Sequence, residues 1–375
     1  MLALGGRLYH SWEWGETRAR IGWRPWRVLV DNDGIPCAAL QIFERQIPAL
    51  GASLLCASSG IAGNSSDGEI IQAFAEWARK FARERHAIVL RVEGHFDDSN
   101  ETQRRLLVSS GFRGLPDQWS LWNLPRANMI IDIRGNQENL LHRMRKKHRE
   151  HILRAQRSSV KIEKSSDFLD LQAFYGLLLK SSERQRFAVR DFDYFWNVHR
   201  HLLQTGRGSL FIATMDGKPV AGILCGWFGS ACHYLYGGFD WSARQAYANE
   251  ALHWAAIQWA RALGCSHYDM VGAGTQYPPV EGNPGYGVYN FKKGFGADLV
   301  YSAGYFDLVN RPALYAALRF AETHTSWVTA ARGAHSFLRR VFARSRRTAA
   351  QSEDGRSIFQ PAVNDTTSPP TRDAQ

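Results

Sequence analysis

The stretch Asp33-Gly34-Ile35-Pro36-Cys37-Ala38 recurs in the second half of the chain as Asp216-Gly217-Lys218-Pro219-Val220-Ala221. Each copy lies between two apolar runs, and an Asp-Gly pair in that setting is a strong β-hairpin signal. Further along, Trp-Ala-Arg occurs at 77–79 and again at 259–261, each time within a helix-like segment. Both landmarks return after roughly half the chain, at nearly the same interval. The sequence therefore indicates two copies of one folding unit.

Length, charge and cysteine usage limit the class of protein. The 375 residues suffice for two domains with cores of their own, and 45% of them are hydrophobic. The net charge of +11 favours an anionic partner such as nucleic acid, a phosphorylated metabolite or a membrane surface, with solubility alone as the alternative. The five cysteines are scattered without a CxxC pair, which predicts free thiols in a reducing cytoplasm and no metal site.

Targeting and membrane signals are weak. The segment Met1 to Arg7 is too short and polar for a signal peptide, and no apolar run approaches the roughly 20 residues that span a bilayer. The helical pattern from Ala313 to about Arg344 combines apolar and basic residues. It could rest on an anionic leaflet or pack on the first domain. We expect a cytoplasmic protein, with peripheral contact at the inner face of the membrane as the only membrane interaction.

The order of elements predicts the fold class. Hairpin, helix, strand and helix follow one another in each half, as in a mixed α/β unit around a mostly antiparallel sheet. That order matches the GNAT acetyltransferase fold, so we expect two tandem acetyltransferase-like domains with a cleft between or beside them. We place the first domain at 1–128, completed by 304–344, and the second at 129–303. Residues 345–375 are rich in Ser, Thr, Asp and Pro and read as a disordered tail.

The donor of such enzymes is normally acyl-CoA, whose pyrophosphate binds a [QR]xxGxG/A loop at the start of a helix. The corresponding helix starts here are 64–68 and 242–249, and neither carries that glycine pattern. Ser66 and Glu69 instead predict a capping box for a helix that runs to about Arg85. We therefore expect acetyl-CoA to bind poorly.

Five stretches of sequence carry a resemblance. They are Ser11-Trp12-Glu13-Trp14-Gly15 with Gly22-Trp23-Arg24-Pro25, the basic segment Met144 to Arg154, Tyr234-Leu235-Tyr236-Gly237-Gly238, Tyr268-Asp269-Met270-Val271-Gly272, and Phe291-Lys292-Lys293-Gly294-Phe295-Gly296. Together, from about Ser11 to Tyr315, they resemble the FemABX family of aminoacyl-tRNA-dependent peptidoglycan peptidyltransferases. The resemblance implies tandem acetyltransferase-like domains, in agreement with the internal repeat.

The resemblance also implies an activity. Its members transfer an amino acid from aminoacyl-tRNA to a stem-peptide amine of a UDP- or lipid-linked peptidoglycan precursor, which builds the cross-bridge. Because the aminoacyl ester is already activated, the acceptor amine is expected to attack it directly, without a covalent enzyme intermediate, a cofactor or a metal. The enzyme is expected to be a monomer. Two alternatives stay open. One is an acyltransferase for another envelope or surface glycan, and the other is a non-catalytic anion-binding module.

The resemblance assigns catalytic roles near the last motif. Lys292 matches a lysine placed beside the reacting ester, where a cation stabilises the developing oxyanion, and the Phe291 carbonyl would orient the amine. Asp269 would hold a backbone or orient Lys292. The glycines after Lys292 imply close backbone approach. A surface lysine at a strand end is the plainer alternative.

Four further residues are expected to bind the precursor. Arg18 and Arg190 match positions that contact its diphosphate, although the family usually has lysine at the first; a solvated arginine is the alternative for each. Tyr236 and Glu93 lie at expected strand ends, where each would contact the stem peptide or serve a structural purpose.

The basic segment from Leu140 to Arg157 predicts one helix, with Leu140, Met144, His148 and Ile152 on its less polar stripe. We expect its cations to grip the tRNA acceptor arm through phosphates, with a solvated face as the alternative. The residues assigned to that contact are Arg143, Lys146, Lys147, Arg149 and Arg154.

Overall fold

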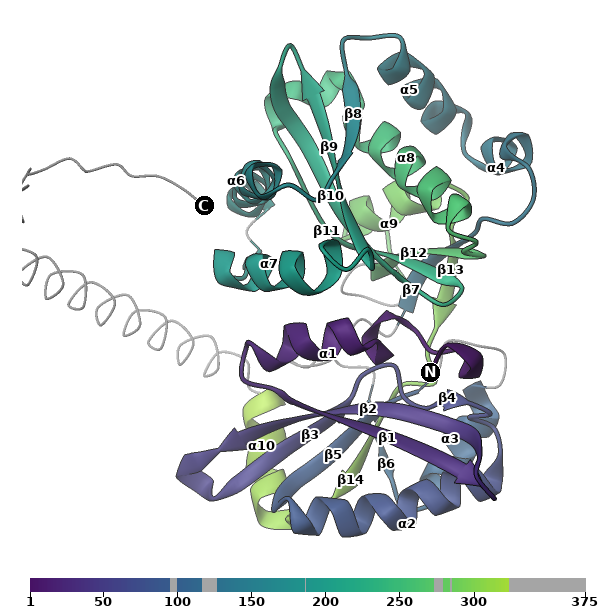
Figure 1. Cartoon of the computed structure of the whole chain (residues 1–375), viewed down its shortest axis with the longest axis vertical. Coiled ribbons are helices and arrows are strands. Elements are labelled where there is room, and N and C mark those ends of the chain that lie inside the picture. The colour runs from purple at the N-terminus through teal and green to yellow at the C-terminus, as the bar shows by residue number, and fades with distance from the viewer. Residues whose placement is uncertain (95–99, 117–126, 186, 273–278, 284, 324–375) are drawn as a thin grey trace, which may run out of the picture. The chain divides into compact units, whose positions relative to one another are not determined.

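The computed structural model describes residues 1–94, 100–116, 127–185, 187–272, 279–283 and 285–323. Over these residues the chain forms two seven-stranded mixed sheets with helices packed beside them (Figure 1). Residues 1–317 make up one compact unit that contains both sheets. The predicted disordered tail, and the predicted helix beyond Thr323, lie outside the described residues.

The first sheet has the order β1-β2-β3-β5-β14-β6, with β4 beside β2. Its strands are β1 (Arg24–Asn32), β2 (Ile35–Ile47), β3 (Ala52–Ala57), β4 (Ala62–Gly63), β5 (Ala87–Glu93), β6 (Arg113–Gly114) and β14 (Tyr305–Val309). The pair β3/β5 is parallel, whereas the other neighbours are antiparallel. The predicted turn at Asp33-Gly34 joins β1 to β2, with both residues in the left-handed conformation that such a turn requires.

The second sheet has the order β13-β7-β12-β11-β10-β9-β8. Its strands are β7 (Ala127–Asp132), β8 (Lys161–Ser165), β9 (Gly208–Met215), β10 (Lys218–Phe228), β11 (Ala231–Phe239), β12 (His267–Gly272) and β13 (Asp298–Tyr301). Here β11/β12 is the parallel pair. The hairpin at Asp216-Gly217 joins β9 to β10, so the two repeated motifs occupy the same place in their sheets.

The two sheets exchange one strand. The two sheets can be aligned strand by strand, with the same order and the same strand directions. The first sheet then runs β1, β2, β3, β5, β14, β6, and the second runs β9, β10, β11, β12, β7, β13. In each sheet the fifth strand of this series comes from the other half of the chain. β7 precedes the second hairpin yet pairs with β12, and β14 follows the whole second sheet yet pairs with β5 (Figure 1). The first sheet is therefore complete only after Val309.

The helices lie between and after these strands. Their bounds are α1 (Trp12–Ala19), α2 (Gly68–Glu84), α3 (Asn100–Ser109), α4 (Gln137–Arg143), α5 (Lys146–Gln156), α6 (Phe168–Gln185), α7 (Phe192–Val198), α8 (Ala248–Ala262), α9 (Tyr286–Lys293) and α10 (Pro312–Thr323). Short 3-10 turns η1 (Leu2–Leu4), η2 (Leu8–His10), η3 (Pro48–Leu50) and η5 (Trp241–Ala246) accompany them, with a π-helical turn η4 (His199–Leu203) after α7. No helix of the described chain is long and apolar enough to cross a bilayer.

The start of α2 differs from the prediction. Asp67, one residue after Ser66, is the N-cap, and its carboxylate accepts bonds from the amides of Glu69 (2.9 Å) and Ile70 (3.4 Å). Both residue types cap helices well, so adjacent candidates cannot be separated by type alone. The helix itself ends at Glu84, close to the predicted Arg85, and its apolar residues Ile71, Phe74 and Ala78 recur with helical spacing and are buried.

The predicted basic helix is in fact two helices, α4 and α5, separated at Met144 and Arg145. Met144 is extended (φ −74°, ψ 149°) because the Arg145 amide donates to the Gly294 carbonyl (2.9 Å) instead of continuing the helix. The predicted stripe holds across this break. Leu140, Met144, His148 and Ile152 are all buried.

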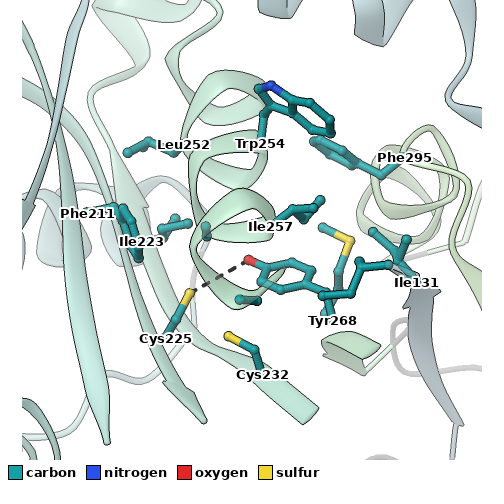
Figure 2. Packing of buried hydrophobic residues seen from close by; sticks show 14 of the residues in the cluster. Ile131, Phe211, Ile223, Cys225, Cys232, Leu252, Trp254, Ile257, Tyr268 and Phe295 are labelled. Atoms are coloured by element: carbon teal, nitrogen blue, oxygen red, sulfur yellow. Dashed lines mark hydrogen bonds between the residues drawn. The ribbon is translucent and has the colours of Figure 1, made fainter. Parts of the chain in front are cut away.

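The second sheet packs on α8 through a core in which Tyr268 is fully buried (Figure 2). The Tyr268 hydroxyl lies 3.0 Å from His253 Nδ1 and 3.7 Å from Cys225 Sγ. Cys225, Cys232 and Cys265 are free buried thiols, as their apolar surroundings predicted. A separate core cluster joins the two halves, because Trp14 and Phe43 pack in it with Phe174 and Phe195. Tyr236 packs against this shared cluster.

Candidate functional site

Lys292 lies in the last turn of α9 and is only 7% exposed. Its Nζ donates to the carbonyl oxygens of Met270 (2.5 Å) and Gly272 (2.7 Å), with the Val271 oxygen at 3.5 Å. Burial lowers the pKa of Lys292 to about 8, against the opposing effect of the Asp269 carboxylate. The alternative of a surface lysine at a strand end is wrong, because the ammonium is buried and comes from a helix.

The end of β12 is shaped to receive this ammonium. Val271 has a left-handed backbone (φ +58°), which is rare and costly for a β-branched residue. The Asp269 carboxylate holds that bend, since its Oδ1 accepts from the Val271 amide at 2.7 Å. β11 pairs with β12 from Ala231/His267 to His233/Asp269, and Lys292 binds β12 directly after this pairing. Of the two roles expected for Asp269, its contacts fit the holding of a backbone.

Asp269 is itself held from two sides. Its Oδ2 accepts from Asn128 Nδ2 on β7 (2.9 Å) and lies 3.3 Å from His233 Nδ1 on β11. Burial disfavours the ionised carboxylate, but the contact with His233 and the Val271 amide outweigh it, so the pKa of Asp269 falls below its usual value. The carboxylate therefore stays charged beside Lys292 at neutral pH.

The two glycines after Lys292 allow α4 and α5 to approach α9. A Cβ at Gly294 would overlap the ring of His148. Gly296 has φ +78°, and a Cβ there would lie 2.9 Å from the Arg143 carbonyl oxygen. The close backbone approach expected from these glycines is therefore present. The Phe291 carbonyl already accepts from His148 Nε2 (3.0 Å) and the Gly294 amide (3.0 Å), so its expected role in orienting an amine stays a prediction.

Arg18, Arg190 and Tyr236 come together although they lie far apart in sequence. The Arg18 guanidinium lies over the rings of Trp23 (4.9 Å) and Phe43 (5.5 Å). The Arg190 guanidinium lies over Tyr194 (4.7 Å), whose hydroxyl accepts from Tyr236 (3.1 Å). Burial lowers the pKa of Arg18, and the charge of Arg190 adds to that effect.

This arginine pair is suited to an anion. Within the described part of the chain, no carboxylate pairs with either guanidinium. Two neighbouring guanidiniums without a counter-charge repel each other, and a doubly charged ligand would relieve that repulsion. The group gathers three of the four residues that were expected to bind the precursor.

The fourth, Glu93, lies at the end of β5 and is 3% exposed. It accepts from the Ser59 amide (2.6 Å) and the Tyr305 hydroxyl (3.4 Å), and burial raises its pKa to about 7. Tyr9, on η2, was missed by the sequence analysis because it belongs to no motif. Burial and then the nearby charges of Asp269, Glu93 and Tyr236 raise the pKa of Tyr9, which places it among the candidate residues of both halves.

The five cations assigned to tRNA divide into two groups. Arg149 turns inward and donates to the carbonyl oxygens of Leu141 (3.3 Å) and Met144 (2.5 Å), which caps α4. Arg143 donates to the Asp132 carbonyl. Lys146, Lys147 and Arg154 project from α5 and are exposed, although Lys146 lies 3.9 Å from Glu150. These last three are the cations of α5 that the fold leaves accessible.

A cavity of about 410 Å³ opens at the start of α8. Its walls include Lys147, Trp241, Arg244, Tyr247 and Phe291. Tyr247, the N-cap of α8, is left-handed (φ +52°) and supplies no side-chain cap. The guanidiniums of Arg184 (4.2 Å) and Arg244 (5.4 Å) lie over Trp241. In the sequence this helix start was notable only for lacking the glycine pattern, and no motif marked its aromatic residues.

Comparison of the sequence with known proteins identifies the class of enzyme. Residues 142–279 match the model of the acetyltransferase (GNAT) domain. The lipid II:glycine glycyltransferase of Staphylococcus aureus strain USA300 is 24% identical over 83% of this chain and 90% of its own length; that of strain Mu50 is 23% identical over the same shares. The chain is thus an acyltransferase built from tandem GNAT-like domains.

Solved structures show the same fold. The crystal structure of FemX superposes with a TM-score of 0.76 at 23% identity, over 83% of this chain and 94% of that one. The C-terminal domain of a putative lysylphosphatidylglycerol synthetase from Agrobacterium fabrum gives a TM-score of 0.51 at 13% identity, over 86% and 93%. The sequence similarity and the shared fold both support membership of the FemABX family, which the motifs had indicated.

Proposed function

We propose that this protein transfers an amino acid from aminoacyl-tRNA to a stem-peptide amine of a lipid-linked or UDP-linked peptidoglycan precursor. The observation that carries the proposal is the buried Lys292 ammonium, held by the carbonyls of β12 and adjacent in sequence to Phe291 in the cavity wall. Lipid II, which the Staphylococcus aureus relatives use according to their name, is the first acceptor to consider.

The cavity at α8 suits the end of a charged tRNA. An uncapped helix start favours a phosphate, because its amides and the helix dipole both attract negative charge. Lys147 and Arg244 add positive charge, while the two carboxylates of the lining, Asp240 and Glu250, are paired with Lys180 and His151. Trp241 offers a ring on which a base can stack. The exposed Lys146 and Arg154 extend this charge along α5. With the tRNA end bound in this cavity, the aminoacyl ester would lie next to Phe291 and Lys292.

Lys292 would act on the ester. An ammonium has three N–H donors, and the short bonds to Met270 and Gly272 use two of them. The third can bind the oxyanion that forms when the acceptor amine attacks the ester carbonyl. Collapse of the tetrahedral intermediate forms the amide and breaks the C–O bond to the tRNA ribose. The proton lost by the amine ends on the ribose oxygen, so the reaction balances without another reactant.

The arginine pair would bind the other substrate. Arg18 and Arg190 can donate bidentately to a diphosphate, which both lipid-linked and UDP-linked precursors contain. Tyr236 and Glu93 are then available to the stem peptide. A lipid-linked acceptor would bring the enzyme to the inner face of the membrane as a peripheral monomer. We retain the domain boundaries 1–128 with 304–344 and 129–303, which sheet membership of β7 and β14 supports.

A second candidate uses the same site with acyl-CoA. The glycine pattern that binds its pyrophosphate is absent, but the uncapped start of α8 offers free amides to its phosphates. The test incubates the enzyme with mixed charged tRNAs or acetyl-CoA, each with lipid-linked or UDP-linked precursor, and detects products by mass spectrometry. Amino-acid addition that needs charged tRNA and is lost in Lys292→Ala supports the proposal. Acetylation of the acceptor, or transfer unaffected by Lys292→Ala, would overturn it.

A further inference from the structure

The histidine of α5 at position 148 faces the interior although its helix carries the exposed cations. His148 is 8% exposed, and its ring packs edge-on against Phe295 at 4.9 Å between centroids. Its Nε2 donates to the Phe291 carbonyl at 3.0 Å. The three nearest atoms to a Cβ built at Gly294 all belong to this ring. His148 therefore fills the space that the glycine leaves free, one turn from Lys292.

Further contacts join the start of α5 to the end of α9. The Arg145 amide donates to the Gly294 carbonyl (2.9 Å), and the Arg145 guanidinium donates to Asn290 Oδ1 (2.7 Å). The last carbonyls of any helix lack partners within the helix and need external donors. Here α5 supplies such a donor at Gly294, and at Phe291 the His148 Nε2 adds a second bond to the one from the Gly294 amide. The chain is therefore held on either side of Lys292.

We propose that His148 is a positioning residue for Lys292, because its ring and Nε2 fix the last turn of α9 from which the lysine extends. A lysine side chain has several rotatable bonds and loses rotamer entropy when it is held in one position. The carbonyls of β12 hold only its tip. Fixing the backbone on the other side keeps the ammonium aimed at the ester. The inference rests on the proposed function only in taking Lys292 as the catalytic residue.

The contact is made by a neutral ring. Burial lowers the pKa of His148, with Arg145 and His151 acting in the same direction and Glu250 and the Phe291 carbonyl opposing. Because the Phe291 oxygen can only accept, the proton must be on Nε2. Among the described residues Nδ1 has no hydrogen-bond partner. One donor to one carbonyl is thus the polar role of this side chain.

Gly294→Ala tests the proposal from the other partner. Gly294 has ordinary helical angles (φ −62°, ψ −23°), so alanine costs the backbone little, and its methyl group would displace the His148 ring. His148→Ala removes the ring, and His148→Gln keeps a donor for the Phe291 carbonyl. Gly176→Ala in α6, where a Cβ meets nothing within 4 Å, is the matched control.

We expect Gly294→Ala and His148→Ala each to lower kcat by up to about 100-fold, the usual cost of a misplaced catalytic group, with little change in KM. The double variant should be no worse than the poorer single one, because both remove one contact. His148→Gln should recover most of kcat. Gly176→Ala should behave as wild type. Effects that multiply in the double variant would overturn the proposal.

A second measurement does not depend on catalysis. Acylation of lysines by acetic anhydride, followed by mass spectrometry of the folded proteins, reports how well Lys292 is protected. We expect slow labelling in wild type and His148→Gln, and faster labelling in Gly294→Ala and His148→Ala. Unchanged protection in the last two would refute positioning by His148. Normal kcat in Lys292→Ala would instead refute the proposed function and leave the labelling result valid.

Discussion

Replacing Lys292 by methionine keeps an unbranched side chain, one atom shorter, and removes its charge. Burial lowers the pKa of this lysine from 10.5 to about 8. Each pKa unit corresponds to about 1.4 kcal/mol, so keeping the ammonium charged in the folded protein costs about 3 kcal/mol relative to the unfolded chain. Between pH 8 and 10.5 the unfolded chain binds a proton that the folded protein has released. The stability of wild type relative to Lys292→Met must therefore rise with pH across that window.

Urea unfolding of both proteins from pH 7 to pH 10.5 measures this directly. The difference in unfolding free energy, wild type minus variant, should rise by about 3 kcal/mol. Other titrating groups cancel because both proteins contain them. At pH 7 the variant should lose about 100- to 1000-fold in kcat, and wild-type kcat should fall as pH rises through about 8, where the ammonium loses its proton. A constant free-energy difference, or a wild-type rate unchanged to pH 10, would refute the assignment of a buried, charged lysine.

Three further predictions concern other parts of the molecule. Asp307→Ala leaves the buried Arg91 without its bidentate partner (2.8 Å for each bond) and should cost about 3–5 kcal/mol in urea unfolding; a loss below 1 kcal/mol would contradict it. Arg190→Ala should raise KM for the precursor with kcat nearly unchanged, and added salt should partly mimic it; a purely kcat effect would remove Arg190 from diphosphate binding. Trp241→Ala removes a stacking surface worth about 1–3 kcal/mol, so KM for charged tRNA should rise about tenfold or more; an unchanged KM would exclude the cavity as the donor site.

The parts of the fold that sequence predicts are those with local causes. The two Asp-Gly hairpins follow from turn chemistry, and the buried stripe of α2 follows from helical periodicity. The internal repeat led to the expectation that 304–344 completes the first domain, but the exchange of β7 and β14 itself has no local cause. Each is a short apolar strand that would fit either sheet, and its place is decided by pairing with β12 or β5 far away in the chain. The break at Met144 likewise depends on the distant Gly294 carbonyl.

The candidate site divides in the same way. Lys292, Arg18 and Arg190 belong to motifs, so the sequence could name them. The sequence did not identify His148 and Trp241 as site residues. His148 lies among the charged residues of a basic helix, and Trp241 lies in a turn that carries no motif. Their roles depend on which side of the element faces α9 or the cavity. Periodicity did place His148 on the buried stripe of α5, which was the available signal.

The two repeats differ at the start of equivalent helices, and on the proposed function this difference would separate the two substrates. The equivalent helices α2 and α8 each follow the third strand of the hairpin series, but Asp67 caps α2 with a carboxylate while Tyr247 leaves α8 uncapped. Asp67 accepts from the free amides at the first helix start, whereas no side chain caps the second, where the first-turn carboxylate of Glu250 pairs with His151. On the proposed function, the phosphate-bearing donor would bind at this uncapped start of α8. The first domain would contribute Arg18, which lies over Phe43 of the shared core and close to Tyr236 of β11.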